Sequence, residues 1–115
     1  MKFERLEMIA REELDHILRE LPAELSPTVT PVPVFFERTP SVEDRASGLE
    51  SDLLGLFDPG PGDGSTPRIR LWLENLWSNA RREDSFREEV RITLLHEIGH
   101  LLGWDEEDLE RRGLG

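Results

Sequence analysis

The sequence predicts one α+β domain over residues 1–115, with an N-terminal helix, a small sheet of about three strands, a long helix and a short C-terminal helix. Three observations support this prediction. Apolar residues recur at helical spacing in 3–21 and again in 86–102, and they alternate with polar residues at strand spacing in 68–74. A chain of 115 residues is also long enough to bury one hydrophobic core.

The first helix is expected over residues 3–21, where apolar side chains follow one helical face and charged side chains cover the rest. Pro22 ends it, because the residue before a proline is driven out of the helical conformation. His16 lies on this helix, and a lone histidine there is expected to be a surface residue.

Two segments in the middle of the chain are expected to be extended. Residues 29–37 are rich in β-branched and aromatic side chains, but Pro31 and Pro33 remove backbone donors and favour an edge strand or an irregular lead-in. Residues 38–52 lack a period and are expected to form a loop, and the short apolar run 53–57 is a second candidate strand.

The clearest strand is Arg68–Glu74, in which Ile69, Leu71 and Leu73 share one face while arginine, tryptophan and glutamate occupy the other. The Pro- and Gly-rich residues 58–67 before it indicate a hairpin connection, with a flap over a site as the alternative.

A linker is expected to lead from this strand to a helix over 86–102. Ser85 and Glu88 fit a capping box at its start, and Gly103 suits the left-handed turn at its end. Its predicted buried stripe consists of Val90, Leu94, Ile98 and Leu101. A last short helix is expected over 105–112.

The composition excludes several classes of partner and site. With 25 acidic and 14 basic residues the net charge is −11, which argues against binding to nucleic acid or to an anionic membrane surface. No apolar run reaches membrane-spanning length and the first residues are too charged for a signal peptide, so a cytoplasmic protein is expected. There is no cysteine, so imidazole and carboxylate groups must hold any metal.

Residues 96–100 contain H-E-x-x-H, formed by His96, Glu97 and His100. Residues i and i+4 of a helix lie on one face, so both imidazoles can reach one metal ion. Glu97 would lie beside that ion without binding it and could take a proton from a metal-bound water. The alternative is a surface or core-edge helix with two histidines by chance, but the helical pattern and the glycine that follows favour the metal site.

Two histidines do not complete a catalytic zinc site, which usually has three protein ligands and a water. A third ligand from the same part of the chain would be one of four acids: Asp105, Glu106, Glu107 and Asp108. A chain that turns back at Gly103 would bring Glu106 toward the ion, and Asp105 is the second choice. The same acids would also suit the start of a helix, with Asp105 as its N-cap.

The stretch RITLLHEIGHLLGWDEEDLERRGL, residues 91–114, resembles the minimal zincins, small bacterial proteins with the pattern HExxHxxGxxD. This resemblance implies their fold, with a small mixed sheet between an N-terminal helix and the active-site helix. It also implies that His96, His100 and the acid at position 106 bind Zn²⁺ and that Glu97 is the general base. Position 106 is Glu in this chain, where the pattern has Asp.

The expected function is therefore that of a zinc-dependent metallohydrolase, specifically a metallopeptidase acting on a peptide or protein substrate. Another divalent metal would also fit such ligands. An extended peptide could pair with an edge of the Arg68–Glu74 strand. Trp72 and Trp104 could line the cleft, although such tryptophans more often cover the edge of the core. The alternative is a non-catalytic metal-binding or protein-interaction module that retains the zincin fold.

Overall fold

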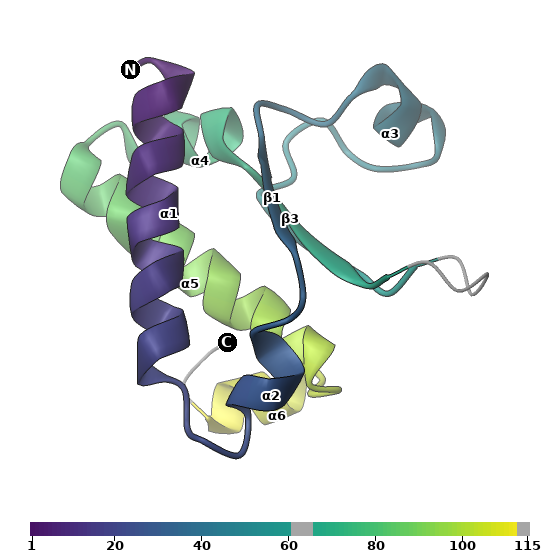
Figure 1. The fold of residues 1–115 in the computed structure, drawn as a ribbon. Coiled ribbons are helices and arrows are strands. Elements are labelled where there is room, and N and C mark those ends of the chain that lie inside the picture. Colours follow the sequence, from purple (N-terminus) through teal and green to yellow (C-terminus); the bar gives the residue numbers. More distant parts are fainter. Residues whose placement is uncertain (61–65, 113–115) are drawn as a thin grey trace.

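The computed structural model describes residues 1–60 and 66–112, in which the elements follow the predicted α+β order (Figure 1). The helices are α1 (Phe3–Glu20), α2 (Ser26–Val29), α3 (Val42–Ala46), α4 (Leu73–Ala80), α5 (Glu83–Leu101) and α6 (Glu106–Arg111). The strands are β1 (Val34–Glu37), β2 (Gly55–Asp58) and β3 (Arg68–Trp72).

The three strands form one mixed sheet in the order β1-β3-β2, with β1 parallel and β2 antiparallel to β3. β2 and β3 pair as the predicted hairpin, and residues 61–65 of their connection lie outside the described residues. Because β3 is the central strand and is paired on both sides, the prediction that it offers a peptide an edge is wrong. The two edges of this sheet belong to β1 and β2.

Only the end of the predicted extended segment 29–37 is a strand. Pairing begins at Val34, after the two prolines that lack a backbone N–H, and the strand lies at an edge as predicted. Val29 instead closes α2, a four-residue helix with a proline in its first turn. A proline is tolerated there because the first N–H groups of a helix have no partner within it.

Two short helices lie where the sequence predicts a loop and a linker. α3 falls within residues 38–52 and begins with a capping box, in which Ser41 and Asp44 each accept a hydrogen bond from the other's backbone N–H. α4 starts directly after β3, so the alternation of residues 68–74 continues two residues beyond the strand. Neither helix is long enough to show the hydrophobic period on which the prediction relied.

α5 is the element around which the others pack, and it contacts α1, α4, β2 and β3. Figure 1 shows α1 crossing it while the sheet lies alongside. Three of the four residues of its predicted stripe are buried, and Leu101 is partly buried against the same core. The fully buried core includes Leu6, Ile9, Ile69, Leu71, Leu73, Leu76, Phe86, Val90 and Leu94.

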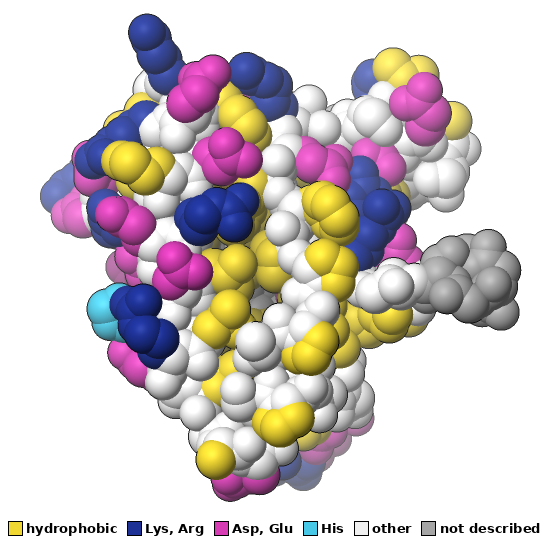
Figure 2. All heavy atoms as spheres, in the orientation of Figure 1, with side chains coloured by type: hydrophobic (Ala, Val, Ile, Leu, Met, Phe, Trp, Pro, Cys, Tyr) yellow, Lys and Arg dark blue, Asp and Glu magenta, His cyan; other side chains and the backbone are white. Residues whose placement is uncertain are grey.

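The surface of α1 carries charged side chains of both signs, whereas hydrophobic side chains follow the seam between α1 and β1 (Figure 2). His16 is exposed on α1 and lies 3.3 Å from the carboxylate of Glu20, in agreement with its predicted surface position. No helix within residues 1–60 and 66–112 combines the length and the apolar character needed to cross a lipid bilayer.

Arg70 of β3 is buried, with 8% of its surface exposed. Its guanidinium donates hydrogen bonds of 2.8 and 2.9 Å to Glu37 of β1 and of 2.6 and 2.9 Å to Asp44 at the start of α3. These hydrogen bonds hold the pKa of the Asp44 carboxyl well below its usual range. Arg70 therefore ties the segment that carries α3 to the sheet.

Replacement of Arg70 by Met is expected to lower the free energy of unfolding by about 2–3 kcal/mol, because two carboxylates would lose their shared cation. The loss stays below that of a fully enclosed pair, since the Glu37 side chain is one-third exposed. Urea denaturation measures this change. The matched control is Arg68→Met on the same strand, whose exposed ion pair with Asp58 should contribute less than about 1 kcal/mol; equal losses in both variants would contradict the prediction.

Candidate metal centre

The helix that carries the motif, α5, begins earlier than predicted. Its first residue is Glu83, and its N-cap, Arg82, makes no side-chain cap bond, so the predicted capping box of Ser85 and Glu88 is wrong. Its end agrees with the prediction. Gly103 has a φ of 83°, the left-handed conformation that glycine adopts without strain, and there the chain turns back toward α5.

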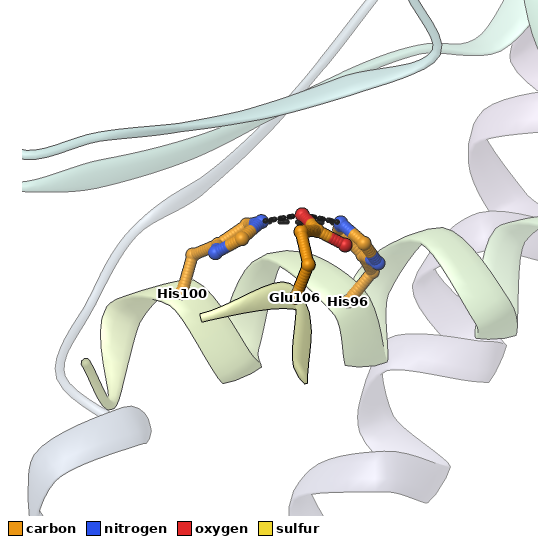
Figure 3. A group of neighbouring side chains, drawn as sticks. All are labelled: His96, His100 and Glu106. Carbon is orange, nitrogen blue, oxygen red and sulfur yellow. Dashed lines mark hydrogen bonds and ion pairs between the residues drawn. The ribbon is translucent and has the colours of Figure 1, made fainter. Parts of the chain in front are cut away.

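His96 and His100 project from successive turns of α5 and present their Nε2 atoms to each other, 3.1 Å apart (Figure 3). Their ring planes are inclined at 81°, with centroids 4.7 Å apart. Both rings are partly exposed. The i, i+4 spacing thus brings two imidazole nitrogens to one point at the protein surface.

Glu106, the first residue of α6, completes a three-residue cluster able to hold a metal ion. Its Oε1 lies 3.2 Å from His96 Nε2 and 3.1 Å from His100 Nε2. The carboxylate of Asp105 has a different role: it caps α6 by accepting a 2.8 Å hydrogen bond from the backbone N–H of Asp108, whose own side chain accepts from Asp105 N–H. The turn at Gly103 therefore places the carboxylate of Glu106 next to the two histidines.

The geometry of this cluster fits zinc. Two imidazole nitrogens and a carboxylate oxygen are ordinary zinc ligands, and a catalytic site keeps a fourth position open. A tetrahedral ion with bonds of roughly 2.0–2.2 Å would separate its ligand atoms by about 3.3–3.5 Å. The triangle formed by the three atoms has sides of 3.1, 3.1 and 3.2 Å, so only small movements are needed to accommodate the ion.

The backbone carbonyl of Trp104 orients His100. Its oxygen lies 3.2 Å from His100 Nδ1, and because a carbonyl only accepts, Nδ1 carries the proton. His100 Nε2 then faces the carboxylate of Glu106. Metal-bound histidines commonly donate their second N–H to a carbonyl in this way, so the contact suits a metal ligand.

Glu97 lies one residue beyond His96, outside the three-residue cluster, and only 8% of it is exposed. Its Oε1 accepts a 2.8 Å hydrogen bond from the backbone N–H of Phe57 in β2. Burial raises the pKa of Glu97, and the hydrogen bond from Phe57 opposes part of this rise. A carboxylate with a raised pKa is a better acceptor for a proton from water.

Gly55 allows β2 to come close enough to α5 for this hydrogen bond. A Cβ atom at position 55 would lie 2.6 Å from Thr93 Cγ2 and 3.5 Å from Glu97 Cγ, so a larger residue would push the strand away from the helix. The hydrogen bond joins residues 40 positions apart, and sequence reasoning missed it. The one available signal was a glycine inside a predicted strand, which can mark a close approach of two backbones.

A family model of zincin-like metallopeptidases matches residues 29–115, a range that includes the sheet, α5 and α6. The chain belongs to the zincin-like metallopeptidase family. This finding confirms the resemblance seen in residues 91–114. A comparison with curated proteins finds no match. In this zincin-like chain, the histidines and the acid named by the resemblance are the residues that meet in the cluster.

The two tryptophans expected in a cleft differ in position in this zincin-like fold. Trp72 is fully buried, so its prediction as a cleft residue is wrong, and its Nε1 has no hydrogen-bond partner among the described residues. Trp104 is partly buried beneath the guanidinium of Arg112, 3.9 Å from the ring centroid. Trp104 also lines a hollow of about 280 Å³ at the end of α1, together with Leu21 and Pro22.

Proposed function

We propose that this zincin-like protein is a zinc-dependent metallopeptidase in which His96, His100 and Glu106 hold the ion and Glu97 is the general base. The observation that carries the proposal is the triangle of ligand atoms, with sides of 3.1–3.2 Å, next to a buried carboxylate. Membership of the family supports peptidase chemistry. Residues 1–115 are proposed to act as one domain, since α1 packs on the motif helix.

Among the side chains of the protein, Glu97 has the main role in the proposed chemistry. Zinc, when bound, supplies a Lewis acid that polarises the scissile carbonyl and acidifies water. Glu97 accepts the proton of the attacking water and returns it to the leaving amine. Because Phe57 N–H holds Oε1 in place, Oε2 is the oxygen that carries this proton.

The proposed substrate is an extended peptide that pairs with the outer edge of β2. This strand lies at an edge of the sheet and contacts Glu97 through Phe57, so a peptide added to it would lie beside the base. β2 thus takes the role first expected of β3. The net charge of −11 favours peptides with neutral or basic side chains.

The proposal is tested by incubating protein purified without chelator with a mixture of unstructured peptides and identifying products by mass spectrometry. We expect cleavage that stops when a chelator removes the metal and returns when zinc is added back. A zinc-loaded protein that cleaves none of the peptides would contradict the peptidase proposal and leave a metal-binding module.

A further inference from the structure

We propose that the contact between Gly99 of α5 and Leu109 of α6 positions Glu106 for metal binding. The inference rests on the metal site proposed above and concerns residues that do not touch the ion. Gly99 lies in the helical turn between the two histidines, and Leu109 lies three residues after Glu106. This contact therefore joins the part of α5 that carries two ligands to the short helix that carries the third.

α6 depends on this contact for its position. It has six residues, and Leu109 is its only buried residue, with 0% of its surface exposed. The other five positions of α6 carry charged side chains that are exposed or half-buried. A helix this short is not stable by itself, so the way its one apolar side chain packs decides where it lies.

Glycine at position 99 is needed for space rather than for backbone conformation. Gly99 lies inside α5 and is not among the residues with positive φ, so alanine would suit its backbone. A Cβ atom there, however, would overlap Leu109 Cδ2 and lie 3.3 Å from Leu109 Cγ. Glycine in the interior of a helix also makes the helix less stable than alanine does, so its presence here needs a packing reason.

The packing reason is that glycine lets α6 lie close enough to α5 for Glu106 to reach the histidines. Residues 106 and 109 are three apart and share a face of α6, so the face that buries Leu109 also directs Glu106 toward α5. Metal–ligand distances tolerate deviations of only about 0.2 Å. Displacing Leu109 by the width of a methyl group would move α6 by more than this and carry the carboxylate out of the triangle.

The test measures zinc affinity by competition with a chromophoric chelator, together with the thermal unfolding of the metal-free protein. Gly99→Ala is expected to weaken zinc binding at least about tenfold, the effect typical of losing a residue that orients a ligand. Leu109→Ala should also weaken it, because α6 loses its buried side chain. In the double variant the new methyl group enters the space left by Leu109, so zinc should bind more tightly than in Gly99→Ala alone.

A second comparison shows whether the effect acts through Glu106. In a Glu106→Ala background, Gly99→Ala is expected to change zinc affinity by less than about twofold, since the ligand that it displaces is already absent. An equal loss in both backgrounds would mean that alanine disturbs the histidine helix itself and would overturn the inference. Unchanged zinc affinity in both Gly99→Ala and Leu109→Ala would overturn it as well.

These experiments distinguish a failure of this inference from a failure of the proposed function. If the wild-type protein binds no zinc, or binds it equally well without the histidines, the metal site itself is wrong. If the wild type binds zinc through the histidines and Glu106→Ala weakens binding, the site stands and only the role of Gly99 and Leu109 is at issue. Should Gly99→Ala fail to fold, Leu109→Ala in the presence and absence of Glu106 gives the same comparison.

Discussion

Replacement of Glu97 by Gln is expected to lower peptide hydrolysis by at least about 10²-fold, while the protein still binds one zinc ion per chain. The amide cannot accept the proton of the attacking water, but it has the same shape as the carboxylate. Its oxygen can also still accept the hydrogen bond from Phe57 N–H. The zinc content and the unfolding temperature should therefore stay close to those of the wild type.

The control for this substitution is Glu107→Gln, which removes an exposed carboxylate from α6 outside the cluster. Its hydrolysis rate should match that of the wild type. Wild-type turnover in Glu97→Gln would show that another group is the base. Loss of zinc from Glu97→Gln would show instead that Glu97 belongs to the ligand set, which would contradict the assignment of Glu106.

Removal of either histidine of the pair is expected to abolish stoichiometric zinc binding. In His96→Ala or His100→Ala only one imidazole and one carboxylate are left, which falls short of a catalytic zinc site. Zinc at about 100 times its dissociation constant should stabilise the wild type by roughly 2.7 kcal/mol and these variants by close to nothing. Thermal unfolding with and without zinc, together with metal analysis of the purified protein, measures both effects.

His16→Ala is the matched control, because His16 is the only other histidine of the chain and lies exposed on α1. This variant should gain as much stability from zinc as the wild type does. If all three histidine variants responded to zinc alike, the ion would be bound outside the proposed cluster.

Much of the fold follows from local patterns in the sequence. The helices of residues 3–20 and 83–101 are long enough for an apolar face to repeat several times, and Gly103 marks the end of the second. The helix α4 could not be predicted this way, because the alternation of β3 continues into Leu73 and Glu74. The buried position of Arg70 was equally hidden, since the carboxylates that compensate its charge lie 33 and 26 residues away.

The candidate site likewise has features that local sequence patterns predict and features that they do not. His96, Glu97 and His100 lie within five consecutive residues of one helix, so their spacing alone predicts that two rings face one point. Whether Asp105 or Glu106 faces the histidines depends on where α6 begins. The capping box of Asp105 and Asp108 sets that start, because it makes Asp105 the N-cap and Glu106 the first helical residue. The hydrogen bond from Phe57 to Glu97 depends on how β2 packs against α5, and the one sequence signal for that packing, Gly55, does not name the partner.

Anomalous diffraction from zinc-loaded crystals tests the metal site most directly. We expect one peak at the zinc absorption edge, at about 2.0–2.2 Å from His96 Nε2, His100 Nε2 and a carboxylate oxygen of Glu106. A peak bonded to Asp105 in place of Glu106, or no peak between the two histidines, would contradict the proposed centre.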